Sequence, residues 1–311
     1  MPRAVAVSPT GLSSFFEICD TGPDGRPLED PELMGARGGG FTLDLLVRTE
    51  VRVKEAERTS ISVRINGSEH EAKTTRAVVE RLLGMADGPY AIEVVHEVPV
   101  PMSCGFGTSG AGALTTALAL SAALSLKLTY NQLGRIAHVA EVSCRTGLGT
   151  VGPLMLGGVI ITVEPGAPGR AVIDRLPAPE GLKVISAVFR PIETRSVLIR
   201  ATGKEKINSA SRRALEAIMA DPCVETFMRA CRDFALESGL ATERTAKLME
   251  ELWSAGIPSA QNMIGEAIHA VVDDREGLER ALAILKRHLP EDKIYVANVC
   301  WRPATLVEVG R

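Results

Sequence analysis

The sequence lacks an excess of positive charge, and this narrows the partners that it could bind. Its 311 residues include 35 Lys and Arg against 38 Asp and Glu, and the formal net charge is −3 at pH 7. Proteins that bind nucleic acid usually show a basic excess. We therefore expect no nucleic-acid partner, whereas a small phosphorylated ligand is compatible with this charge. The hydrophobic share of 45% and the charged share of 23% argue against disordered, collagen-like and coiled-coil chains.

Paired cysteines, metal-ligand spacings and membrane spans are also missing. The six cysteines and five histidines are scattered, without a CxxC pair or a zinc-ligand pattern, as is typical of reduced thiols in a cytoplasmic protein. The longest uncharged apolar stretch, 111–126, is short for a bilayer span and is interrupted by Thr and Ser, which predicts a buried helix. No basic region precedes an apolar core at the N-terminus, so we expect no signal peptide. These absences predict a soluble cytoplasmic protein without a membrane partner.

Strand and helix patterns occur in both halves of the chain. The stretch 60–65 alternates at period two and ends at Asn66-Gly67, a strong hairpin signal. Thr129 and Gln132 have the spacing of a capping box, which predicts a helix beginning there. The predicted strands are 4–7, 41–47, 51–53, 60–65, 91–98, 182–189, 196–199 and 293–301. The predicted helices are 75–85, 109–126, 129–144, three between 205 and 255, and 276–286.

A stretch rich in Gly and Pro, 163–169, is the best candidate for a boundary between two units. A chain of this length is about twice a typical domain. We therefore predict an α/β (α+β) fold with two lobes. The N-terminal lobe would comprise residues 1–165 and contain a phosphate-binding loop, and the C-terminal lobe would comprise residues 166–311.

That loop is a glycine-rich segment between a predicted strand and a long predicted helix, Pro101-Met-Ser-Cys-Gly-Phe-Gly-Thr-Ser-Gly-Ala-Gly112. Glycines let the backbone approach a ligand closely, and the next helix directs free N–H groups and its positive dipole end at the loop. Such a loop suits phosphate, and the hydroxyls of Thr108 and Ser109 could reach a phosphate or a magnesium ion. Alternatively, the glycines only ease the packing of a tight turn. The loop has no Lys of the Walker type and no dinucleotide fingerprint.

A second cluster places three polar residues on one helical face. His138 and Glu141 are three positions apart, and Glu141 and Arg145 are four apart. A carboxylate there could complete a magnesium site opposite Ser109. The alternative is a solvated ion pair between Glu141 and Arg145. The glycine-rich turn 146–152 directly after the cluster, together with the phosphate loop, favours the magnesium site.

The pattern Pro-x3-Gly-x-Gly-Thr-Ser-Gly-Ala resembles the phosphate-binding signature of the GHMP kinase superfamily. Across most of its length the chain is similar to the archaeal pantoate kinase branch of that superfamily. Besides the Gly105–Leu114 loop, the similarity comprises Ser8-Pro9, Gly35-Ala-Arg-Gly-Gly-Gly-Phe41, His138-x-x-Glu141, Arg145-Thr-Gly-Leu-Gly149 and Phe189-Arg-Pro-Ile-Glu-Thr194.

This resemblance implies a two-lobed GHMP-kinase-like fold with the active site in the cleft between the lobes. It also implies transfer of the γ-phosphate of ATP to a hydroxyl of a small carboxylic acid, pantoate, in coenzyme A biosynthesis. Members of the superfamily often form homodimers. Ser109 and Glu141 would hold Mg²⁺ and act in catalysis with the residue at position 150. The phosphates would lie on Pro101, Gly105, Gly107, Thr108, Ser109, Gly110, Ala111 and Gly112, and the acceptor on Gly38, His138, Arg145 and Thr194.

Several positions depart from the pattern of this branch, and they cluster on the acceptor side. Thr150 stands where an Asp usually orients or deprotonates the attacking hydroxyl, and a threonine cannot act as a general base at neutral pH. Ala36 stands where Ser is usual, and Thr162 where a basic residue would pair with the acceptor carboxylate. Phosphoryl transfer tolerates the loss of a base, because it depends mostly on positioning and charge stabilisation.

Three functions are therefore compatible with the sequence. The first is an ATP- and magnesium-dependent kinase acting on pantoate. The second is a paralogue with the same nucleotide loop but another acceptor or a non-kinase phosphate chemistry, which Thr150 suggests. The third is a ligand-binding protein that keeps the fold without catalysis.

Overall fold

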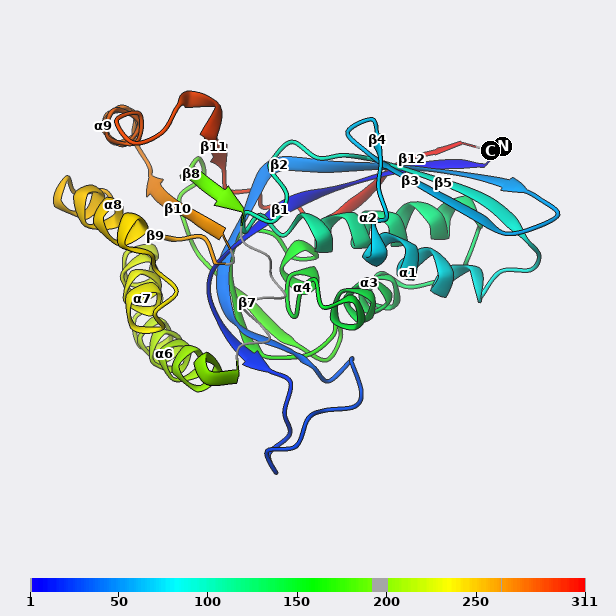
Figure 1. Ribbon diagram of the computed structural model, residues 1–311, viewed down its shortest axis with the longest axis horizontal. Coiled ribbons are helices and arrows are strands. Elements are labelled where there is room, and N and C mark those ends of the chain that lie inside the picture. Colours follow the sequence, from blue (N-terminus) through cyan, green and yellow to red (C-terminus); the bar gives the residue numbers. More distant parts are fainter. Residues whose placement is uncertain (1, 192–200, 264, 311) are drawn as a thin grey trace.

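The structure is a computed structural model, which describes residues 2–191, 201–263 and 265–310. Its strands form two sheets of unequal size. The larger sheet has eight strands: six are in the order β12-β1-β2-β5-β3-β4, β6 pairs with β2, and β7 pairs with β6 (Figure 1). Its strands are β1 (Arg3–Cys19), β2 (Gly35–Glu55), β3 (Ser60–Ile65), β4 (Ser68–Glu69), β5 (Tyr90–Glu97), β6 (Val159–Glu164), β7 (Val172–Leu176) and β12 (Thr305–Gly310).

The smaller sheet has four strands in the order β11-β8-β10-β9. They are β8 (Lys183–Pro191), β9 (Ser259–Gln261), β10 (Gly265–Val272) and β11 (Ile294–Asn298). Helices cover both sheets and lie in two groups (Figure 1): one group packs on the larger sheet and the other lies beside the smaller sheet. The first group is α1 (Lys73–Leu83), α2 (Thr108–Ala123), α3 (Tyr130–Cys144) and α4 (Val151–Leu154). The second is α6 (Ala201–Ala220), α7 (Val224–Glu237), α8 (Glu243–Ser254) and α9 (Arg275–Leu285), followed by the 3-10 turn η1 (Glu291–Lys293).

Local signals explain where several elements begin and end. The predicted hairpin turn joins β3 to β4, and both of its residues have positive φ, 48° at Asn66 and 84° at Gly67. The predicted capping box starts α3: the backbone N–H of Gln132 donates to Thr129 Oγ1, and the N–H of Thr129 donates to Gln132 Oε1. The uncharged apolar stretch is the buried helix α2, whose residues are buried on nearly every side.

The mixed α/β prediction is confirmed, and the structure adds that the strands form two sheets, which the sequence patterns did not reveal. The short strands predicted at 4–7, 41–47 and 51–53 are parts of two long strands, β1 and β2, which run through the middle of the molecule (Figure 1). The strand predicted at 196–199 lies outside the described residues. The division at residue 165 stays a prediction; β7 and β12, which follow it, pair with β6 and β1 of the larger sheet. Within the described ranges, every helix is too short or too polar to cross a membrane.

Candidate active site

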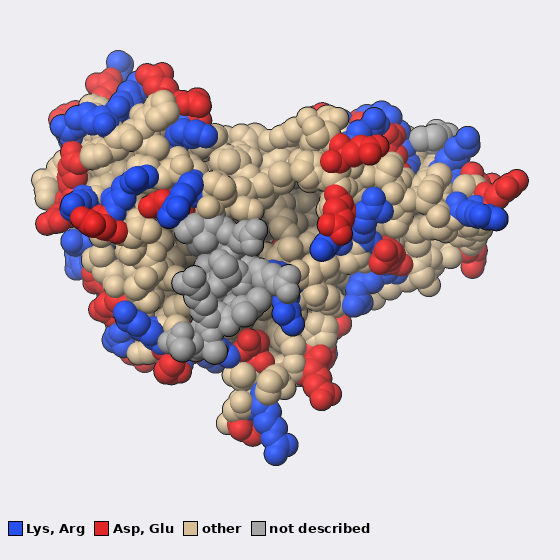
Figure 2. Space-filling model, viewed as in Figure 1, with Lys and Arg blue, Asp and Glu red and all other residues tan. Residues whose placement is uncertain are grey.

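A cavity of about 600 Å³ lies where β1 and β2 meet the first turns of α1 and α2. Figure 2 shows the surface hollowed between the part formed by α1–α4 and the part formed by α6–α9. Further walls come from the end of α3, the segment that leads to α4, β6, and residues at the ends of β3 and β5. Of the described residues after 176, Met263 is the one that lines the cavity, and its backbone N–H donates to the carbonyl of Ser13 at 2.9 Å. A cavity of this size suits a small ligand.

The glycine-rich loop places the start of α2 at the cavity. Gly107 is the N-cap of α2 in the left-handed conformation, with φ 58°, and no side chain caps the helix. A Cβ at this position would lie 2.7 Å from the carbonyl oxygen of Gly11 and 2.7 Å from Thr150 Cγ2, so a larger residue would be strained and crowded. The free N–H groups of the first turn therefore face a site suited to an anion. Of the predicted phosphate-binding residues, Gly105, Gly107, Thr108, Ser109 and Gly112 line the cavity, whereas Pro101, Gly110 and Ala111 stand behind the lining.

Glu141 is a buried carboxylate without a full set of partners. The side chain is 2% exposed, and one oxygen, Oε1, accepts a hydrogen bond from Thr146 Oγ1 at 3.4 Å. The other, Oε2, has no hydrogen-bond partner among the described residues. Burial raises the pKa of Glu141 to about 7, although hydrogen bonds from Ser109 and Thr146 oppose the shift. An uncompensated carboxylate is costly to bury, so this position calls for a cation.

Two glycines make room for that carboxylate. A Cβ on Gly110 would lie 2.8 Å from Glu141 Oε2, and a Cβ on Gly147 would lie 2.6 Å from the same atom. Both glycines are thus needed for the helix and the following turn to close on Glu141. The solvated ion pair considered for Glu141 and Arg145 does not form in the described structure, because the carboxylate is buried beneath these turns.

The donor atoms at this position fit a magnesium ion. Carboxylate and hydroxyl oxygens of Glu141, Ser109 and Thr146 meet there, and Mg²⁺ prefers oxygen ligands. The described residues form no cluster of three or more His, Cys, Asp or Glu. Mg²⁺ is commonly held by one or two carboxylates together with phosphate oxygens of a substrate.

Thr74, at the start of α1, joins this group although the sequence analysis did not select it. Its Oγ1 lies 2.9 Å from Thr146 Oγ1, and Ser109 Oγ donates to it at 3.4 Å. Its partner Thr146 belongs to a motif that the resemblance identified. Thr74 does not, and a threonine in the first turn of a helix is too common to signal a site. Thr74 was therefore detectable only from the packing of α1 against α2 and α3.

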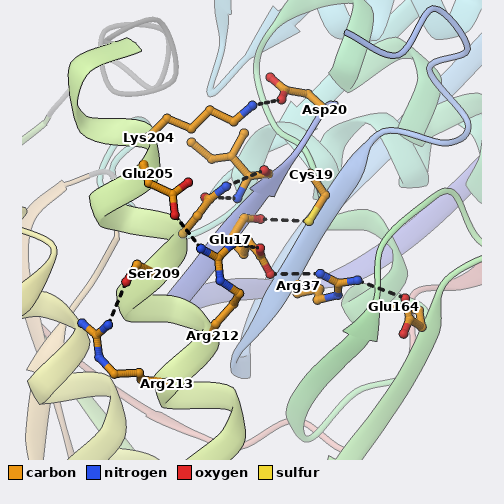
Figure 3. Close-up of polar contacts among 12 residues, drawn as sticks. Glu17, Cys19, Asp20, Arg37, Glu164, Lys204, Glu205, Ser209, Arg212 and Arg213 are labelled. Atoms are coloured by element: carbon orange, nitrogen blue, oxygen red, sulfur yellow. Dashed lines mark hydrogen bonds and ion pairs between the residues drawn. The ribbon is translucent and has the colours of Figure 1, made fainter. Parts of the chain in front are cut away.

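Two arginines reach the cavity with different surroundings. Arg37 is held on three sides. Its Nε donates to the carbonyl of Val163 at 3.1 Å, and its two terminal nitrogens donate to Glu17 at 3.2 Å and Glu164 at 3.4 Å (Figure 3). Arg145, the left-handed C-cap of α3 with φ 56°, lines the cavity and makes no ion pair within the described part of the chain. Arg145 is therefore the cation with more capacity for an anionic ligand.

The Glu17 carboxylate of β1 joins the two long strands of the larger sheet to α6, next to Arg37 of the cavity wall. Glu17 is 5% exposed and accepts from Arg37 of β2 and, at 2.9 Å, from Arg212 of α6. Next to it, the side-chain amide of Asn208 bonds both backbone groups of Ile18, at 2.8 and 3.0 Å. These contacts fix α6 to β1 (Figure 3).

The other acceptor-side residues are distributed as follows. Gly38, Ala36, Thr162 and Thr150 line the cavity. His138 lies behind the lining, where its Nε2 is 3.2 Å from the carbonyl of Pro31 and 3.0 Å from that of Met34. Burial lowers the pKa of His138, so its neutral ring donates to this connection between β1 and β2. Its predicted contact with an acceptor stays a prediction, and Thr194 lies outside the described residues.

Comparison with known proteins supports the same functional class. Residues 72–158 match the model of the GHMP kinases N terminal domain. The pantoate kinase of Thermococcus kodakarensis is 33% identical over 270 residues, which cover 85% of this chain and 88% of that protein. The pantoate kinase of Methanocaldococcus jannaschii is 27% identical over 281 residues, 90% of this chain and 96% of that protein.

Solved structures share the architecture over nearly the full length. A phosphotransferase related to the CoA biosynthesis pathway has a TM-score of 0.86 and 29% identity, with 98% of both chains covered. A mevalonate diphosphate decarboxylase from Staphylococcus aureus has a TM-score of 0.75 at 14% identity, covering 99% of this chain and 98% of that one. The second likeness concerns the fold alone.

Proposed function

The chain belongs to the GHMP kinase family and is a phosphotransferase, and from this premise we propose that it transfers the γ-phosphate of ATP to a hydroxyl group of pantoate. The observation that supports transfer of a phosphate is the buried Glu141 Oε2, which has no hydrogen-bond partner in the described part of the chain and lies beside the start of α2, where no side chain caps the helix. Pantoate as the acceptor is supported by the 33% identity to a pantoate kinase. The comparisons do not favour a paralogue with another acceptor. Cytoplasmic location and dimerisation stay predictions.

The nucleotide phosphates would lie on the glycine-rich loop. There, the free N–H groups of Thr108 and Ser109 would donate to phosphate oxygens, and the helix dipole would favour their negative charge. Ser109 and Glu141 would hold Mg²⁺, which when bound neutralises charge on the phosphate oxygens. With a cation beside it, Glu141 would stay ionised, because an opposite charge offsets the cost of burial.

The acceptor would enter from the side formed by β2 and β6. Its carboxylate needs a cation, and Arg145 offers a guanidinium without an ion pair, whereas Arg37 is already held by Glu17 and Glu164. Thr150 cannot remove the proton of the attacking hydroxyl at neutral pH. Its hydroxyl can still orient the acceptor, and a loose transition state depends chiefly on such positioning.

Release of ADP by the purified protein with Mg-ATP, with and without pantoate, tests this function. We expect ADP release to require pantoate. Replacing Arg145 with Gln should raise the KM for pantoate about tenfold or more, the range for one charge-assisted hydrogen bond, and leave the KM for ATP within about twofold. Arg81→Gln, on the exposed end of α1, is the matched control. ADP release that pantoate does not increase would refute the acceptor, and a raised KM for ATP alone would reassign Arg145 to the nucleotide.

A further inference from the structure

Four side-chain oxygens from four segments meet at one point beside the start of α2. They belong to Thr74 of α1, Ser109 of α2, Glu141 of α3 and Thr146 of the turn after α3. Thr74 Oγ1 is the centre of this group, 2.9 Å from Thr146 Oγ1 and 3.4 Å from Ser109 Oγ, while Thr146 Oγ1 lies 3.4 Å from Glu141 Oε1. All four residues line the cavity, and Thr146 Oγ1 also lies 3.4 Å from the backbone carbonyl of Glu141.

The hydroxyl of Thr74 has unused capacity for a ligand. A hydroxyl has one proton to donate and two lone pairs. Thr74 Oγ1 contacts the hydroxyls of Thr146 and Ser109, and the Thr74 side chain also lies beside the Cys144 thiol, whose pKa is raised by burial and lowered by this neighbour. Such bonds are easily exchanged for a cation or a phosphate oxygen without leaving a backbone group unpaired. The side chain is 7% exposed, so its position is set by packing and not by solvent.

A separate buried network holds Thr74 in place. The neighbouring Thr75 Oγ1 lies 3.0 Å from His96 Nε2, and the other ring nitrogen, Nδ1, lies 2.7 Å from Thr49 Oγ1 of β2. Thr49 in turn meets Thr115 of α2 at 2.6 Å. Burial lowers the pKa of His96 to about 4, so the ring is neutral and uses one nitrogen as donor and the other as acceptor.

This network replaces an ordinary helix cap. The N-cap of α1 is Ala72, in the left-handed conformation with φ 43°, and it makes no side-chain cap bond. The first turn of α1 is therefore fixed by Thr75 and His96 on one side and by the Thr74 cluster on the other. Because Thr74 and Thr75 are adjacent, a shift at His96 would move the Thr74 hydroxyl relative to Ser109.

We propose that Thr74 is a further ligand of the cation and phosphate at the Ser109–Glu141 site, and that His96 is a positioning residue which sets its place through Thr75. This inference rests on the proposed nucleotide site but not on the identity of the acceptor. It predicts that loss of the Thr74 hydroxyl weakens cation binding even when no phosphate is transferred.

Binding of Mn²⁺ in the presence of a non-hydrolysable ATP analogue, followed by electron paramagnetic resonance, tests the ligand role. Thr74→Val should raise the Kd for Mn²⁺ about tenfold, as expected for one lost oxygen contact, whereas Thr74→Ser should stay within about twofold of wild type. Thr116→Val is the control, because its buried hydroxyl bonds the carbonyl of Gly112 within α2. Thermal unfolding verifies that each variant is folded, and Thr74→Ala replaces Thr74→Val if the valine does not fit.

The outcomes separate this inference from the proposed function. The ligand role would be overturned if Thr74→Val kept the wild-type Kd for Mn²⁺, or if Thr74→Ser lost as much affinity for Mn²⁺ as Thr74→Val. It would also be overturned if the wild-type protein bound no Mn²⁺ in the presence of the nucleotide analogue. Thr75→Val should weaken Mn²⁺ binding about threefold without changing the Thr74 hydroxyl, and an unchanged Kd would overturn the role of His96. A wild type that binds Mn²⁺ and nucleotide but ignores pantoate would refute the acceptor and leave the Thr74 result valid.

Discussion

The end of the cavity that we assign to the phosphates, the phosphate end, and the end that we assign to the acceptor, the acceptor end, differ in how their charged groups are satisfied. At the phosphate end, Glu141 keeps one oxygen without a partner among the described residues, and α2 begins without a side-chain cap. At the acceptor end, Arg37 is already bound to a carbonyl and two carboxylates, and small side chains at Ala36 and Thr162 form the wall. The phosphate end therefore has unsatisfied polar groups that a charged ligand would complete. If Arg145 serves the acceptor as we propose, the acceptor end offers mainly space and this one guanidinium, and the choice of acceptor would depend on few contacts.

Replacing Glu141 with Gln should remove the negative charge of the phosphate end, and we expect this substitution to have the largest effect on kcat. The amide keeps the shape but loses the charge that would hold Mg²⁺, so we expect kcat to fall by at least about 10²-fold, comparable with the loss of one key electrostatic group in an enzyme. The KM for pantoate should stay within about twofold, because the acceptor end is untouched. Steady-state ADP release measures both constants, with the exposed Glu80→Gln as the control. Retained turnover would show that the carboxylate does not serve the phosphates.

The pH dependence of stability should reveal the same carboxylate without any substrate. Burial raises the pKa of Glu141 in the folded protein from 4.5 to about 7. The folded state then binds this proton more tightly than the unfolded state. The contribution of protonated Glu141 to the free energy of unfolding is therefore fully present below about pH 4.5 and is lost as the pH rises through 7. The loss amounts to about 3 kcal/mol.

Urea unfolding at several pH values, compared between wild type and Glu141→Gln, measures this contribution. The wild type should lose stability between pH 5 and pH 8 relative to the variant, whose amide does not titrate. Mg²⁺ with a nucleotide analogue should restore much of the loss at pH 8, since the ligand binds the ionised carboxylate. Parallel pH curves for the two proteins would contradict the shifted pKa.

The substitution Thr150→Asp tests the comparison between the two ends of the cavity, and its expected effect on kcat is smaller than that of Glu141→Gln. Thr150 lies next to both ends: a Cβ on Gly110 would be 3.1 Å from Thr150 Cβ and 2.8 Å from Glu141 Oε2. A carboxylate at position 150 would add a base for the acceptor hydroxyl, typically worth ~10²-fold or more, but it would also stand near the buried Glu141. We expect a net rise in kcat of about tenfold, measured against Thr150→Asn. No rise would mean that the acceptor site, and not the base, limits the reaction.

Local signals predicted the helices that form the end of the cavity assigned to the phosphates. The capping box at Thr129 and Gln132 fixed the start of α3, and hence the position of Glu141 three turns later, because both depend on neighbouring residues alone. The glycine-rich loop likewise stands at the start of α2, as expected. By contrast, β10 escaped prediction because all of its residues are buried, which removes the alternation of polar and apolar residues that reveals a half-exposed strand.

The sequence could not show contacts that depend on the packing of segments far apart in the chain. Thr74 meets Ser109 and Thr146 only because α1 packs on α2 and α3. His138 has the helical spacing of a site residue, yet its ring bonds the carbonyls of Pro31 and Met34 because the connection between β1 and β2 crosses α3 at that point. Helical periodicity gives the face of a helix but not the segment that covers it.

The strand β12 has a consequence for how the molecule folds. It pairs with β1, so that Arg3 lies beside Gly310 and Ala4 beside Val309, with nearly the whole chain between the partners. Closing so long a loop is entropically costly, and contacts of such separation form late. Until residues 305–310 have been synthesised and docked, β1 presents an unpaired edge, the kind of template that invites pairing with another chain. The last strand of the larger sheet therefore also acts as its protection against aggregation, and delayed docking of β12 would leave the nascent protein exposed at β1.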